Sequence, residues 1–300
     1  MPDLPPLLPM VAGAPTSRSC AAHGLALSKV KCNMSEVLPR LVLCVLAADN
    51  QFSVLKREIS VAIPTLASGF EIDADFSSAA HDERMLRAFD VCWDRLPPST
   101  HDASDEQAVA QHGGVIYVVS PHMQPGTHIE VCLRALALIE KMFALGASAV
   151  KSETAGNAHG KAHWLALAHS ALAAHKEGDH LAVMRNCRLA LTHRPLVSDG
   201  WIGSVGYHLV GLPEIAIDED LGDQIPLTHA MDAIADYLAQ HGIEATVAAT
   251  EGEHEFSSSY EDDDFKFNPY GQIYCRALLN SPNGVDAAVP EKKKRFLGLF

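Results

Sequence analysis

Helix-like and strand-like segments alternate over residues 104–150, and this alternation constrains the fold more than any other feature of the sequence. Two short apolar runs, VIYVVS (115–120) and ASAV (147–150), flank a longer segment whose apolar residues recur with helical spacing. Such a succession favours a right-handed crossover that leaves the two strands paired in parallel. SDEQ (104–107) and THIE (127–130) match the capping-box pattern, and Gly146 is the expected residue after the end of the central helix.

Other patterns extend this architecture along the chain. Apolar or alternating runs predict strands at 40–48, 69–75, 201–210, 214–218, 244–250, 255–260 and 272–279. Helical patterns cover 50–60, 82–96, a segment from 159 or 161 to 175, and a segment from a Thr228 cap to Gly242; 181–191 suits either structure. Together they predict one α+β domain over 38–280. We expect a mixed sheet with a βα crossover half, antiparallel C-terminal strands and helices packed on the sheet.

The two ends of the 300-residue chain differ from this domain in composition. Residues 1–37 are predicted to be a disordered or mis-assigned extension, because Met34 stands just before the first expected strand. Residues 281–300 are predicted to be a flexible tail that ends in KKKRFLGLF, basic and then apolar. That tail suits a solubilising role, contact with an anionic membrane or docking in a groove.

Composition narrows the classes of function. A net charge of −14 argues against non-specific nucleic-acid binding, which requires a basic surface. No apolar run reaches the roughly 18 residues of a spanning helix, so no stable membrane insertion is expected. The seven cysteines form no CxxC pair and mostly lie in apolar runs, which favours buried, reduced thiols and a cytoplasmic location. Neither GxxxxGK[ST] nor HExxH occurs, and no cofactor is predicted.

A dense group of polar residues follows the expected strand at 147–150. Lys151 and Glu153 are candidate catalytic residues, and Ser152, Thr154 and Gly156 are candidate ligands for an anion near a helix start. The alternative is local: a hydroxyl caps a turn and the lysine pairs with the glutamate.

Three further groups of residues are candidates for chemistry or binding. His159 and His163 would share one helix face, as a metal pair requires, although 16 histidines make such spacings common by chance. His208 and Glu214 flank a Gly-Leu-Pro turn and are candidate catalytic partners. An acidic run suits either a solvated hairpin edge or a surface for a basic protein. Its centre is Glu261, Asp262, Asp263 and Asp264.

Several segments resemble a bacterial domain family known as unknown-function domain 4261. The resemblance rests on the strand at 41–48, the block GASAV at 146–150, the turn GLPE at 211–214 and Asn268-Pro269 with Gly271. It covers about 38–280 and implies a cytoplasmic bacterial α+β protein, without implying a reaction. From charge and motifs we expect a non-enzymatic protein-binding module of the accessory or immunity type. The alternative is a hydrolase or small-ligand or anion-binding protein with a site around residues 151–163.

Overall fold

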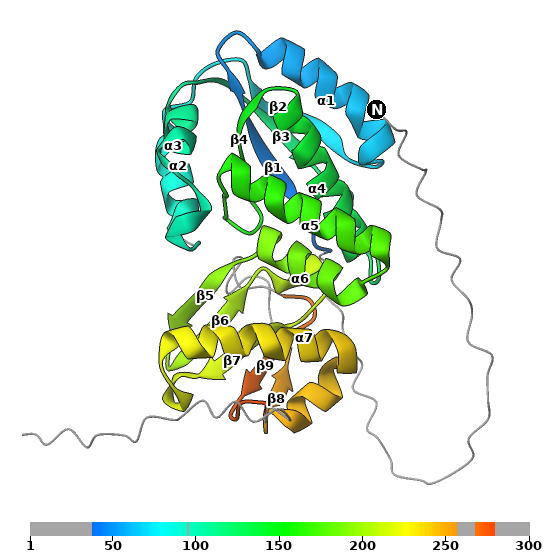
Figure 1. The fold of residues 1–300 in the computed structure, drawn as a ribbon, viewed down its shortest axis with the longest axis vertical. Coiled ribbons are helices and arrows are strands. Elements are labelled where there is room, and N and C mark those ends of the chain that lie inside the picture. The colour runs from blue at the N-terminus through cyan, green and yellow to red at the C-terminus, as the bar shows by residue number, and fades with distance from the viewer. Residues whose placement is uncertain (1–37, 95, 257–267, 280–300) are drawn as a thin grey trace, which may run out of the picture. The chain divides into compact units, whose positions relative to one another are not determined.

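The computed structural model describes residues 38–94, 96–256 and 268–279. In this part of the chain seven α-helices pack against two sheets, which is the α+β fold expected from the sequence (Figure 1). The first sheet is built from residues before position 153 and the second from residues after position 192. The expected extension at 1–37, the acidic residues 261–264 and the tail at 281–300 lie outside the described residues.

The first sheet has the strand order β2-β3-β1-β4 and is antiparallel at every pairing. Its strands are β1 (Val42–Ala48), β2 (Glu71–Ser78), β3 (His112–Val119) and β4 (Ala147–Ser152). The expected parallel pairing of β3 with β4 is wrong. Both run antiparallel to β1, so they share a direction, but β1 lies between them.

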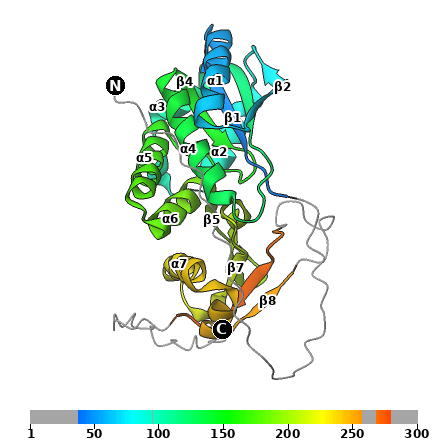
Figure 2. The same cartoon turned by 90° about the vertical axis from the view of Figure 1, so that its right-hand side faces the viewer.

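Helices cover both faces of this sheet (Figures 1 and 2). The odd-numbered residues of β1 share a core with α1 (Phe52–Leu66), α4 (His128–Ala144) and α5 (Lys161–Glu177). Its even-numbered residues Cys44 and Leu46 pack with α2 (Arg84–Trp93) and α3 (Ala103–Ala110), which follow one another across a short 3-10 turn. Burial on both faces explains why the β1 sequence is a continuous apolar run instead of an alternating one.

The second sheet has the order β5-β6-β7-β9-β8 and is mixed, since β7 and β9 run parallel. Its strands are β5 (His193–Ser198), β6 (Trp201–Val205), β7 (Glu214–Asp218), β8 (Glu253–Glu255) and β9 (Gln272–Cys275). The long helix α7 (Gln224–Ala249) follows β7 and covers the isoleucine-rich face of this sheet (Figure 2). Residues 181–191, which suited either structure, lie in α6 (His180–Leu191).

Two of the expected caps are wrong. The capping box of α3 is formed by Asp102 and Asp105, two residues earlier than the SDEQ pattern indicated. Thr127 precedes α4 but its hydroxyl donates to the carbonyl of Gln124 and caps no amide of the helix. Gly146 fits its expected role, because its φ of 98° is the left-handed conformation that glycine adopts without strain.

The last helix also differs from expectation. It begins after Asp223, so Thr228 lies inside it and donates to the carbonyl of Gln224. Gly242 breaks the helix with a φ of 81°, as its identity indicated, but the chain resumes helical structure to Ala249 where a strand was expected. The helical segment is retained because Ile243, Thr246 and Val247 turn one face toward the core.

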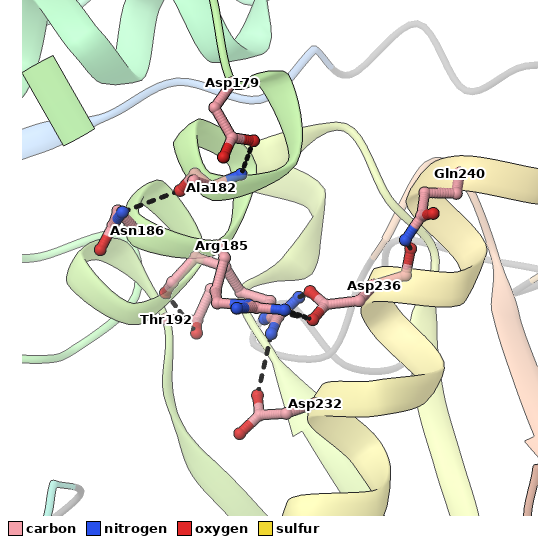
Figure 3. A network of polar contacts seen from close by, with 9 residues as sticks. Asp179, Ala182, Arg185, Asn186, Thr192, Asp232, Asp236 and Gln240 are labelled. Atoms are coloured by element: carbon pink, nitrogen blue, oxygen red, sulfur yellow. Dashed lines mark hydrogen bonds and ion pairs between the residues drawn. The ribbon is translucent and has the colours of Figure 1, made fainter. Parts of the chain in front are cut away.

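An ion-pair network joins α6 to α7 (Figure 3). The guanidinium of Arg188 is buried and donates to Asp232 at 3.0 Å and to Asp236 at 3.1 Å. Asp236 also accepts from Arg185, whose side chain is half exposed. The buried arginine lies 5.7 Å from the ring of Tyr207, so the network anchors both helices next to the second sheet.

Candidate functional site

The loop after β4 is held by its own backbone. Ser152 and Asn157 exchange two amide hydrogen bonds, of 2.8 and 3.2 Å, and the amide of Gly156 donates to the carbonyl of Glu153. Gly156 has a φ of 62°, which is why the tight return needs a glycine there. The loop is therefore a closed turn and not an open phosphate-binding loop.

The candidate anion ligands of this loop make structural contacts. The hydroxyl of Thr154 donates to the carbonyl of Arg40 and accepts from the amide of Val42, both at 2.9 Å. The hydroxyl of Ser152 is fully buried and accepts from the amide of Ala155 at 3.5 Å. The two bonds of Thr154 fasten the loop to the start of β1, a long-range contact and not the turn cap of the local alternative. Ser152, Thr154 and Gly156 do not converge as an anion cradle.

Lys151 and Glu153 do converge on a hollow. The Lys151 ammonium lies 2.9 Å from a Glu153 oxygen and 5.7 Å from the centre of the Phe89 ring, and the lysine is 4% exposed. With Gly156 and residues of α2 they line a space of about 570 Å³, which we call the Lys151 hollow. Burial of the lysine is tolerated because a carboxylate and an aromatic face replace the lost water.

Two arginines of α2 also line the Lys151 hollow, and the sequence reasoning missed both. Arg84 pairs with Asp82 at 2.7 Å, whereas Arg87 makes no ion pair with any residue that the structure describes. Their three-residue spacing places them on one face of a helix, which is the signal that identifies them. The neighbouring thiol of Cys44 is unreactive, since burial raises its pKa to about 12.

His159 and His163 lie together but not on one helix. Gly160 precedes α5, so only His163 is helical, and the two ring centres are 4.8 Å apart. Nε2 of His159 lies 3.1 Å from the carbonyl of Ala190. Burial, followed by the nearby His163, lowers the pKa of His159 to about 3. Within the described ranges no group of three or more His, Cys, Asp or Glu side chains is placed to hold a metal.

Gly160 owes its place to close packing against Asp105. A Cβ at Gly160 would lie 2.0 Å from a carboxylate oxygen of Asp105, whose other oxygen accepts the Lys161 amide at 2.9 Å. Asp105 thus caps α5 as well as closing the capping box of α3. This second role joins residues 56 positions apart, and no local pattern predicts it.

His208 and Glu214 contact each other, as the sequence analysis considered. His208 Nδ1 lies 3.6 Å from Glu214 Oε1, and the carboxylate also accepts from the Ser204 hydroxyl at 2.5 Å and the Tyr207 amide at 2.9 Å. The Gly206 amide, at 3.2 Å, and the side-chain amide of Asn268, at 3.1 Å, also donate to it. Burial raises the pKa of Glu214, but the hydrogen bonds from His208, Ser204 and Asn268 outweigh it and leave the pKa lowered. The buried carboxylate is therefore held as an anion.

This cluster does not have the arrangement of a hydrolase triad. The Ser204 hydroxyl donates to the carboxylate and not to a histidine, and its oxygen accepts the Ile215 amide at 2.8 Å. A nucleophilic serine instead donates to the base that removes its proton. The Glu214 cluster, made of Ser204, Tyr207, His208, Glu214 and Asn268, holds the connection between β6 and β7. The residues that line the Lys151 hollow come from other elements, mainly α2, β4 and the loop after β4.

A second hollow, of about 350 Å³, lies beside the Glu214 cluster. We call it the Trp201 hollow; Trp201, Gly203, Glu214 and Tyr274 line it together with residues of β5. The sequence reasoning missed it, although the alternation in WIGSV indicated a strand with one face covered and one open.

No protein-family model, no curated protein and no solved structure matches this chain. The resemblance to unknown-function domain 4261 therefore stays a hypothesis. In the described part of the chain, no helix is both long and apolar enough to cross a bilayer, and the five cysteines found there are buried.

Proposed function

We propose that this chain is a non-catalytic binding protein, an accessory or immunity-like module that acts by masking another protein. The observation that carries the proposal is the use of the candidate polar groups: Thr154 and Ser204 hold backbone, Lys151 neutralises Glu153, and Glu214 is enclosed by donors. An enzyme site gathers such groups around a space that a substrate occupies. Here these groups make their hydrogen bonds and ion pairs to other groups of the same chain.

The partner that suits this chain is a basic protein surface. A net charge of −14 raises the rate of encounter with a basic partner. Added salt weakens this attraction. The acidic run at Glu261, Asp262, Asp263 and Asp264 is the densest source of that charge in the sequence, and we propose it as the contact.

The test compares two variants that lose the same charge. E261Q/D262N/D263N/D264N removes the proposed contact. D90N/D94N/E177Q/E244Q removes four exposed carboxylates that make no side-chain hydrogen bond or ion pair with other described residues. Each full-length chain is immobilised, and proteins captured from an extract of the source organism are quantified at low and high salt.

We expect wild type and the control D90N/D94N/E177Q/E244Q to capture one basic protein stoichiometrically. The amount captured by E261Q/D262N/D263N/D264N should be at least about tenfold lower. Absence of a stoichiometric partner, or an equal loss in both variants, would refute the proposal.

A second candidate is binding of a small anion in the Lys151 hollow. It is favoured by the near-complete burial of Lys151 beside Arg87, an arginine without an ion pair among the described residues. For hydrolysis, Glu153 would have to leave its ion pair with Lys151 to act as a base. Thermal stabilisation by inorganic phosphate that is lost in Lys151→Met and Arg87→Gln would support anion binding. Equal stabilisation in both variants and wild type would exclude this hollow.

A further inference from the structure

The two faces of the second sheet differ in what covers them. Ile202, Ile215 and Ile273 point to the buried side, where they share the core with α7. Trp201 and Tyr274 point to the other side and are only partly buried. The Trp201 hollow lies on this second side.

Gly203 opens the centre of the hollow. A Cβ built on it meets only the carbonyl oxygen of Leu196, at 3.9 Å, so nothing in the fold requires a glycine at this position. The absent side chain leaves a space beside Trp201 and Tyr274. Their rings are 5.0 Å apart and inclined at 77°, so two aromatic walls meet nearly at a right angle.

Two of the described residues that line the hollow carry a carboxylate, Asp199 and Glu214, and none of these described lining residues is a lysine, arginine or histidine. Asp199 accepts from the hydroxyl of Ser198. Glu214 is surrounded by a hydroxyl, backbone amides, the amide of Asn268 and the imidazole of His208, and contacts no lysine or arginine of the described chain. Aromatic faces and carboxylates both attract positive charge.

We propose that the Trp201 hollow binds a small organic cation of the alkylated-ammonium class. The alkyl groups pack against Trp201, Tyr274 and Leu196, and the charge lies toward the exposed carboxylate of Asp199. A hard metal ion suits the site less well, because such ions need six or more oxygen ligands and most of this wall is aromatic or aliphatic. The volume of about 350 Å³ is at the small end of ligand sites, which favours a compact head group.

The test is a calorimetric titration of the full chain with choline and with 3,3-dimethylbutan-1-ol, which has the same shape without the charge. We expect saturable choline binding and an affinity at least about tenfold weaker for the neutral alcohol. Tetramethylammonium should compete with choline, because the proposed contacts are to the alkylated head group. No saturable response to choline, or equal affinity for the alcohol, would overturn the proposal.

Two variants locate the site. Gly203→Val fills the hollow with a residue that suits a strand and meets no close atom, so it should abolish binding while the circular dichroism spectrum is unchanged. Asp199→Asn keeps size and tolerates the φ of 53° at this position, and should weaken choline binding by about fivefold or more. Glu177→Gln, an exposed carboxylate outside the hollow, is the matched control. Undiminished binding in both Asp199→Asn and Gly203→Val would exclude this hollow as the site.

Discussion

Replacing Arg188 by methionine should destabilise the protein far more than replacing Arg185, although both arginines pair with Asp236. The side chain of Arg188 is 2% exposed and that of Arg185 is 51% exposed. Methionine keeps the apolar stem that packs near Tyr207 and removes only the charge and its donors. The pair of variants therefore separates burial from charge pairing.

The expected magnitudes follow from what each variant leaves behind. Arg188→Met removes two charge-assisted bonds, each contributing roughly 1.5–3 kcal/mol. The sum is an upper bound: Asp232 is 47% exposed and regains water, and Asp236 keeps Arg185. Removal of a buried guanidinium nitrogen, Nε, that has no partner among the described residues also offsets part of the loss. We expect about 2–3 kcal/mol for Arg188→Met and at most about 1 kcal/mol for Arg185→Met.

Urea unfolding at pH 7, followed by circular dichroism and tryptophan fluorescence, measures both values, and coincident transitions are required before free energies are compared. Adding 1 M salt should abolish the Arg185→Met effect by screening and leave most of the Arg188→Met effect. The reasoning is refuted if the two variants cost the same, or if Arg188→Met lies within about 0.5 kcal/mol of wild type.

Three further changes have defined outcomes. His159 has a folded pKa of about 3 against about 6.5 when unfolded. The contribution of neutral His159 to the free energy of unfolding is therefore fully present above pH 6.5. It falls as the pH decreases toward 3, by about 2 kcal/mol at pH 5. His159→Gln should flatten this slope in urea titrations at several pH values, and exposed His175→Gln should not. Gly113→Ala should cost roughly 1–3 kcal/mol, because its Cβ would lie 2.5 Å from backbone, whereas Gly203→Ala should be near neutral in thermal unfolding. Trp164→Phe loses a buried 2.9 Å hydrogen bond and should cost about 1–3 kcal/mol by chemical denaturation; no change would contradict that role.

Local patterns located most elements because helices and strands depend on residues a few positions apart. The apolar stripe at 127–143 and Gly146 gave α4 and its end, and the VIYVVS run gave most of β3. Pairing could not be derived in the same way. The strand–helix–strand succession gives β3 and β4 a common direction, but the insertion of β1 between them depends on long-range packing that has no local signature.

The candidate residues were harder to interpret than the elements, since a polar side chain has the same identity whether it binds a ligand or the backbone. Thr154 donates to a carbonyl 114 positions away, and only the folded chain reveals that partner. The His159–His163 spacing indicated a helical pair, but Gly160, the residue that ends that interpretation, was already visible between them. The packing of Gly160 against Asp105 could not be seen in the sequence.

The partner proposal and the cation proposal respond differently to salt, and this difference separates them. A protein contact spread over Glu261, Asp262, Asp263 and Asp264 depends on several exposed charges, so its affinity should fall steeply as the Debye length shortens from about 10 to 3 Å. A single alkylated ammonium in the Trp201 hollow gains from contact with the aromatic rings, which salt screens weakly. Choline affinity that changed as steeply with salt as partner capture would mean that the general negative field of the chain attracts the cation. A shallow dependence, lost together with binding in Gly203→Val, would assign the interaction to the hollow.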